Sequence, residues 1–226
     1  MGKHFTLTAS DSFKLGAYRA DPSGKAKGGI VLIQEIFGVN HHIRAVCDRL
    51  AGEGYAALAP AVFDRQQPNF ESGYSPDEIA NARKFVANPA WNAMLRDVQA
   101  AIDELKKNGP VSIMGYCMGG TISFLAACRL NGLSAAVCYY GGQIAKNADE
   151  KSKVPTQMHF GEQDASIPMS DVEMIKKARR RRRNLRLSQR ATRLSLRRAR
   201  QLQRRSRQAR LAAGDGVFGQ AREVAD

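Results

Sequence analysis

The stretch "MGYCMGG", residues Met114–Gly120, places a cysteine at the centre of a Gly-x-Cys-x-Gly pattern. A nucleophile on a sharp turn between a strand and a helix needs small neighbours, and Gly115, Gly119 and Gly120 meet that need. The apolar run before Cys117 and the helical pattern after it predict such a turn, and a helix N-terminus favours the reactive thiolate. A structural cysteine buried in a glycine-rich turn is the alternative interpretation.

The rest of the chain supplies elements that would position this turn. Strands are expected in the alternating N-terminal stretch, as a strand pair, and in the apolar runs of "GGIVLIQEIFGVN", "GYAALAP", "GPVSIMGY", "LSAAVCYYGG" and "VPTQMHFGEQD". Helices are expected at "HHIRAVCDRL", at "SPDEIANARKFVAN" behind the capping Ser75, from about Trp91 to Lys107, and directly after Cys117. Strands alternating with helices predict a mostly parallel sheet covered on both faces.

Three motifs, "QEIFGVN", "GYCMGG" and "HFGEQD", occur in this order and resemble those of the dienelactone hydrolase family of α/β-hydrolases. The resemblance covers most of residues 1–178. It implies an α/β fold of the α/β-hydrolase type, with a mostly parallel, doubly wound sheet. It also implies a carboxylic ester hydrolase that acts on small lactones or esters.

The resemblance implies roles for individual residues. Cys117 would be the nucleophile, and Asp164, after the strand ending "MHFG", would be the acid that orients a histidine. Glu35 would be the loop carboxylate that helps to control the ionisation of the nucleophile. The attack would give a thioester that water hydrolyses, and no metal or organic cofactor is required.

Two further roles follow from the same resemblance. The backbone N–H groups of Ile36 and Met118 would form the oxyanion hole, since Ile36 follows an early strand and Met118 follows the nucleophile. Arg65, in "FDRQQP", would bind the carboxylate of the substrate. A solvated arginine is the alternative interpretation of Arg65.

The histidine that such a site needs has no evident candidate. The chain has four histidines, His4, His41, His42 and His159, and none of them follows Asp164. His159 falls inside an expected strand, where we expect it to pack in the sheet. His41 and His42 open an expected helix.

The sequence changes character after Ala178, and we expect two parts: a hydrolase-like domain over residues 1–178 and an arginine-rich tail over residues 179–226. The tail holds 16 of the basic residues and three acids, so it carries +13 of the net charge of +14. A shifted reading frame in a GC-rich gene would produce such a tail. Re-read one nucleotide later, Asn184–Arg190 can encode Ile-Phe-Val-Tyr-Pro-Ser-Gly, and Thr192–Leu194 can encode His-Gly-Phe.

If the tail is genuine, the C-terminal strand and helix of the fold are missing or disrupted, and the chain lacks its general base. The chain would then be an inactive hydrolase, or a dead scaffold whose tail binds nucleic acid nonspecifically through phosphate contacts. A frameshift would instead mean that the intended protein had a full Cys-His-Asp triad. These alternatives stay open at the level of the sequence.

Composition limits the location of the protein. No run approaches the roughly 18 apolar residues that a membrane helix needs, and the N-terminus lacks the apolar core of a signal peptide. Cys47, Cys128 and Cys138 lack the paired spacing of a zinc site and are expected to be small buried hydrophobic residues. We therefore predict a cytoplasmic protein without a membrane partner or a bound metal.

Overall fold

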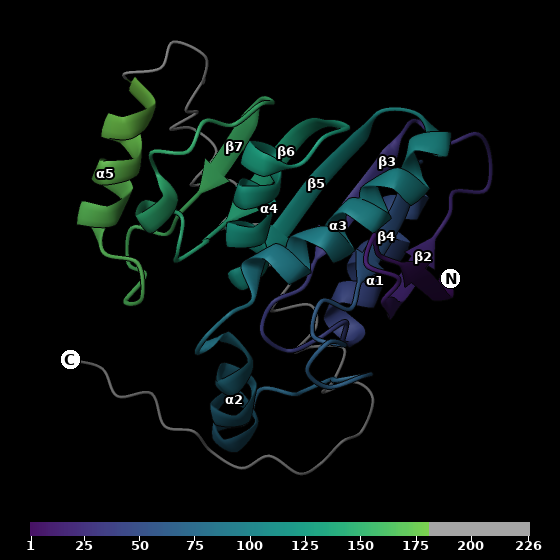
Figure 1. Cartoon of the computed structure of the whole chain (residues 1–226), viewed down its shortest axis with the longest axis horizontal. Coiled ribbons are helices and arrows are strands. Elements are labelled where there is room, and N and C mark those ends of the chain that lie inside the picture. The colour runs from purple at the N-terminus through teal and green to yellow at the C-terminus, as the bar shows by residue number, and fades with distance from the viewer. Residues whose placement is uncertain (181–226) are drawn as a thin grey trace, which may run out of the picture. The chain divides into compact units, whose positions relative to one another are not determined.

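The computed structural model describes residues 1–180, which form a seven-stranded sheet with helices on both faces (Figure 1). The strands are β1 (Lys3–Thr8), β2 (Lys14–Ala20), β3 (Gly29–Ile33), β4 (Ala56–Pro60), β5 (Val111–Tyr116), β6 (Leu133–Tyr139) and β7 (Thr156–His159). Their order across the sheet is β1-β2-β4-β3-β5-β6-β7. The first two pairings are antiparallel and the other four are parallel. The N-terminal strand pair and the mostly parallel sheet are therefore confirmed.

The α-helices of the described residues are α1 (His41–Gly52), α2 (Pro76–Arg83), α3 (Trp91–Leu105), α4 (Met118–Arg129) and α5 (Met169–Arg180). Figure 1 shows α3 and α4 on the near face of the sheet and α1 on the far face. α5 lies beside β7 at one end of the sheet, and α2 lies apart from the sheet. Helices on both faces are the arrangement that a parallel sheet requires, because its strands are apolar on both sides.

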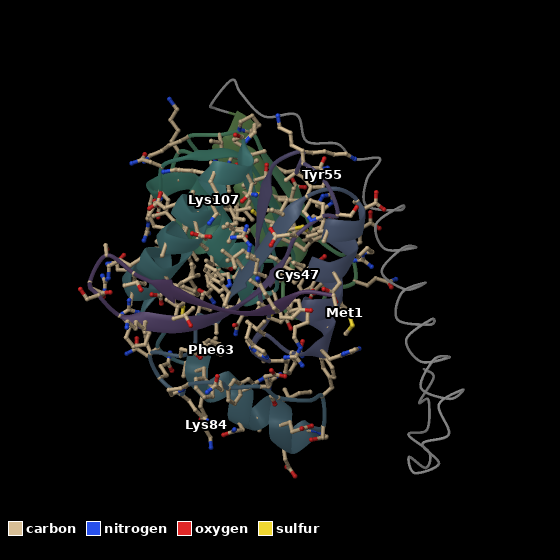
Figure 2. The ribbon with its side chains drawn as sticks, turned by 90° about the vertical axis from the view of Figure 1, so that its right-hand side faces the viewer. Met1, Cys47, Tyr55, Phe63, Lys84 and Lys107 are labelled. Carbon is tan, nitrogen blue, oxygen red and sulfur yellow. The ribbon has the colours of Figure 1, made fainter. Side chains whose placement is uncertain are left out.

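The buried side chains form two clusters, one on each face of the sheet. The smaller cluster lies under α1 and includes Cys47, which is labelled in Figure 2. Cys47, Cys128 and Cys138 are 0%, 9% and 0% exposed. The prediction that these three cysteines are small buried hydrophobic residues is confirmed, and burial raises the pKa of each thiol.

Local sequence signals explain where the helices begin. The Ser75 hydroxyl accepts a hydrogen bond from the backbone of Glu78, and the Glu78 carboxylate accepts one from the backbone of Ser75, with Pro76 at the first helical position of α2. The Asn40 side chain caps α1 by accepting from the backbone N–H of Ile43. These caps place the loops that precede α1 and α2.

The predicted boundary at residue 178 falls inside α5, which continues to Arg180. Residues 181–226 lie outside the described part of the chain. The predictions of an arginine-rich tail and of a missing or disrupted C-terminal strand and helix therefore stay predictions. Within residues 1–180, no helix is both long enough and apolar enough to cross a membrane.

Candidate active site

Cys117 lies on a sharp turn between β5 and α4. Its backbone has φ 55° and ψ −120°, a conformation that residues other than glycine rarely adopt. Its N–H donates to the carbonyl oxygen of Tyr139 at 3.0 Å, which ties the turn to the end of β6. The strain is the kind that a surrounding structure holds in place at a functional site. The turn that the sequence predicted is thus present.

The glycines around Cys117 allow the turn to pack closely. A Cβ added to Gly119 would lie 2.5 Å from the carbonyl oxygen of Gln34, and one added to Gly115 would lie 2.2 Å from the carbonyl oxygen of Gly119. Only residues without a Cβ fit at these positions. The first turn of α4 therefore packs directly on the loop that follows β3, which is the loop of Glu35 and Ile36.

The structure brings Glu35 and Asp164 to Cys117. β3 and β5 are parallel neighbours, so Glu35 and Cys117 emerge at the same edge of the sheet. Asp164 follows β7, and its carboxylate accepts from the backbone N–H of Ser166 at 2.9 Å. Both carboxylates act electrostatically on the Cys117 thiol. Three residues from separate loops thus form one cluster of ionisable groups.

The surroundings of Cys117 favour the thiol over the thiolate. Burial raises the pKa of Cys117, and the nearby charges of Glu35 and Asp164 raise it further. The backbone N–H of Met118, at the start of α4, acts in the opposite direction but does not outweigh them. The helix N-terminus therefore acts in the direction that the sequence predicted, but burial is the larger effect, and the pKa of Cys117 lies above its ordinary value.

Tyr140 is a site residue that the sequence analysis missed. Its hydroxyl donates to Oε1 of Glu35 at 3.0 Å, and its backbone has a strained φ of 38°. Burial raises the pKa of Glu35, and the hydrogen bond from Tyr140 opposes that rise. The position of Tyr140 just past the strand beside β5 was a signal that could have suggested it.

The histidines of the described residues lie as the sequence indicated. His159 ends β7 and stacks on the ring of Tyr139, with centroids 4.7 Å apart, so the prediction that it packs in the sheet is confirmed. His41 and His42 open α1. The His42 imidazole interacts electrostatically with Glu35. Within residues 1–180, no histidine forms a hydrogen bond with Cys117 or Asp164.

Ile36 and Met118, the residues predicted to form the oxyanion hole, lie on the two segments that meet at Gly119. No carbonyl or side chain in the described part of the chain accepts from the backbone N–H of Ile36. Met118 is the first residue of α4, so its N–H has no acceptor within the helix. The Ile36 N–H is therefore available to bind an oxygen atom of a substrate, whereas the Met118 N–H also hydrogen-bonds the sulfur of Cys117.

Arg65 has partners other than a substrate. Its guanidinium donates to both carboxylate oxygens of Asp97, at 2.8 to 3.1 Å, and to Asp11 at 2.9 Å. It also stacks over the ring of Phe13, 4.3 Å from the centroid. These contacts give Arg65 a structural role in joining α3 to the turn between β1 and β2. Its role in substrate binding stays a prediction.

No three His, Cys, Asp or Glu side chains within residues 1–180 are grouped so that they could hold a metal ion.

A strained turn after a central strand, with an acid after a later strand and backbone N–H groups beside it, is the arrangement of the α/β-hydrolase class. Solved structures share this fold. The chain superimposes with a TM-score of 0.69 and 29% identity on a dienelactone hydrolase-type protein of Klebsiella pneumoniae, covering 83% of this chain and 85% of that one. An esterase of Pyrococcus furiosus shares the fold at a TM-score of 0.61 and 15% identity, over 83% and 81% of the two chains.

Sequence comparison defines the family. Residues 15–188 match the model of the dienelactone hydrolase family. The carboxymethylenebutenolidase of Pseudomonas putida is 31% identical over 183 residues, 75% of each chain. A relative from Synechocystis sp. is 36% identical over 185 residues, again 75% of each chain. The chain belongs to the dienelactone hydrolase family, and the predicted family and fold class are confirmed.

Proposed function

We propose that the protein hydrolyses small lactones or esters through Cys117. The observation that carries the proposal is the strained turn at Cys117, whose thiol is influenced by the carboxylates of Glu35 and Asp164 and by the backbone N–H of Met118. The carboxymethylenebutenolidases among its relatives support the substrate class.

The reaction would proceed in two displacements. The Cys117 thiolate attacks the carbonyl carbon, and the oxyanion of the tetrahedral intermediate binds the N–H groups of Ile36 and Met118. The bond to the leaving oxygen then breaks, and the leaving alcohol takes up a proton. Water hydrolyses the resulting thioester, which releases the carboxylic acid and restores the thiol.

Glu35 would control when the nucleophile becomes active. Its carboxylate, which accepts a hydrogen bond from Tyr140, acts electrostatically on Cys117 and would accept the thiol proton as a substrate displaces water from the site. Asp164 would orient a histidine that carries the proton to the leaving group. In the frameshift hypothesis, that histidine is encoded by the alternative reading of Thr192–Leu194, outside the described residues.

An acyl-trapping experiment tests the nucleophile. We expect p-nitrophenyl acetate to add one acetyl group to Cys117, and the adduct to persist because the chain as written has no histidine after Asp164 to activate water. Intact-mass and peptide mass spectrometry would locate it. Cys117→Ala should abolish the adduct, whereas Cys128→Ser, which removes a buried thiol, should leave it in place. An adduct that forms equally on Cys117→Ala would contradict the proposal.

Resequencing the source gene across the codons for Lys176 to Asn184 tests the frameshift. A missing or added base is the expected result, and the corrected protein should then turn over esters. A confirmed sequence would mean that the arginine-rich tail is genuine. Only in that case does the predicted nonspecific binding of nucleic acid by residues 179–226 need a test. The cytoplasmic location also stays a prediction.

A further inference from the structure

The loop that carries Ile36 is bound by a second segment, residues 70–75, which we call the 70–75 segment. Gly38 and Glu71 form an isolated antiparallel bridge, and the N–H of Ser72 donates to the carbonyl oxygen of Phe37 at 3.1 Å. Gly38 has φ 77°, and a Cβ there would lie 2.0 Å from the carbonyl oxygen of Phe70. The two backbones therefore pack directly on each other, one residue beyond the peptide group of Ile36.

Side chains close the same contact. The rings of Phe37 and Tyr74 pack edge to face with centroids 4.7 Å apart. The amide of Asn40 donates to the Tyr74 hydroxyl at 3.2 Å, while its oxygen caps α1. Arg44 forms an ion pair with Glu71. The contact thus links the middle of the loop between β3 and α1, and the end of that loop next to α1, to the 70–75 segment.

The 70–75 segment is itself held in place. The ring of Phe70 packs on that of Phe85, with centroids 4.2 Å apart, and the Asp64 carboxylate accepts from the N–H of Asn69 at 3.0 Å. Glu78 at the start of α2 accepts from the backbone of Gly73 at 3.1 Å. A segment fixed at both ends can hold its neighbour in one conformation.

We infer that Tyr74 is a positioning residue for the oxyanion hole. It acts through Phe37 and Asn40, which follow Ile36 in the loop between β3 and α1. The inference rests on the proposed function, because it assigns the Ile36 N–H to the oxyanion hole. Tyr74 itself is 47% exposed and contributes no group to the reaction. Its ring keeps the Ile36 donor aimed at the position that the oxyanion occupies, where small displacements are costly.

The test compares two reactions of the same thiol. Acetylation by p-nitrophenyl acetate passes through an oxyanion, whereas alkylation by iodoacetamide does not. We expect Tyr74→Ala to slow acetylation of Cys117 about tenfold and to leave alkylation nearly unchanged. Tyr74→Phe keeps the ring and loses only the hydroxyl, so it should restore most of the acetylation rate.

Tyr55→Ala is the matched control, because Tyr55 lies far from α2 at the opposite end of the view in Figure 2 and packs on Lys27. It should change neither rate, and thermal unfolding would verify that each variant is folded. If the parent protein forms the adduct, then equal losses of acetylation and alkylation rates in Tyr74→Ala, or no loss in either rate, would overturn the inference. Absence of the adduct in the parent protein would overturn the proposed function and this inference together.

Discussion

The surroundings of Cys117 and those of Arg65 are both assembled from segments far apart in the sequence, yet they treat charge in opposite ways. Around Arg65, every charge has a partner: the guanidinium binds Asp97 and Asp11, and Asp11 also binds Arg96. Around Cys117, two carboxylates face a thiol, and burial raises the pKa of both Glu35 and Cys117. The charges near Arg65 are paired with one another. Near Cys117, burial disfavours the ionised forms of Glu35 and of the thiol.

The difference indicates what each region is for. Ion pairs that satisfy one another stabilise a fold and leave little capacity for chemistry. Groups whose pKa values are shifted by burial and by like charges are typical of active sites, because they are poised to exchange protons when a substrate changes their surroundings. The contrast predicts that substitutions near Arg65 change stability, and that substitutions near Cys117 change reactivity.

The largest expected effect is that of Arg65→Met. It leaves the Asp97 carboxylate, 1% exposed, without its partner, and should lower the free energy of unfolding by about 3–5 kcal/mol. Urea unfolding would measure this. Arg96→Met is the control, because Arg96 is 43% exposed and its loss should cost only about 0–1 kcal/mol. If Arg65→Met were as stable as the parent and lost acetylation only by carboxylate-bearing esters, the substrate-binding role would be correct instead.

A smaller effect on stability is expected at the nucleophile turn. Gly119→Ala forces a Cβ against the backbone of Gln34 and should cost about 1–3 kcal/mol, while also disturbing the alkylation of Cys117. Gly24→Ala is the control, because nothing lies within 4 Å of its added Cβ. Equal stability of the two variants in urea unfolding would show that α4 does not pack on the Glu35 loop in this way.

Glu35→Gln is expected to have the smallest effect on stability of these substitutions. It should nevertheless change the reactivity of Cys117 clearly. Ionised Glu35 raises the pKa of Cys117, so removing its charge should lower that pKa and make alkylation by iodoacetamide faster at pH 8. The measurement is the rate of alkylation as a function of pH. A slower reaction would mean that Glu35 assists ionisation of the thiol even without a substrate.

Tyr140→Phe refines the same measurement. The variant removes the hydrogen bond from Tyr140 to Glu35, so the pKa of Glu35 should rise further. The change in alkylation rate that accompanies the titration of Glu35 should therefore occur at higher pH. Tyr139→Phe is the matched control, because the Tyr139 side chain makes ring contacts with Tyr116 and His159. An identical profile for both variants would remove Tyr140 from the control of Glu35.

Much of the site could be predicted from the sequence, because its parts are local. The turn at Cys117 follows from glycines within three residues of it, and the caps of α1 and α2 follow from Asn40 and Ser75. The family resemblance, carried by three short motifs, pointed to Glu35, Cys117 and Asp164 as parts of one site. His159 could be assigned to packing because it falls inside an apolar strand.

Tyr140 and the partners of Arg65 could not be predicted in this way. The hydrogen bond from Tyr140 to Glu35 joins residues 105 positions apart, and the pairing of Arg65 with Asp97 joins residues 32 apart. Such pairs form only when the sheet and helices bring distant segments together. No local pattern in the sequence records them.

The sequence by itself determined the class of the fold and the family, since these depend on residue types and short spacings, and it supplied the candidate for the nucleophile. The tertiary structure decided which charges are paired and in which direction the pKa of the Cys117 thiol is shifted. The physical reason is that burial and electrostatic interactions sum over all neighbours in space. At Cys117 the largest contribution is burial, which opposes the effect of the helix N-terminus and could not be read from the sequence.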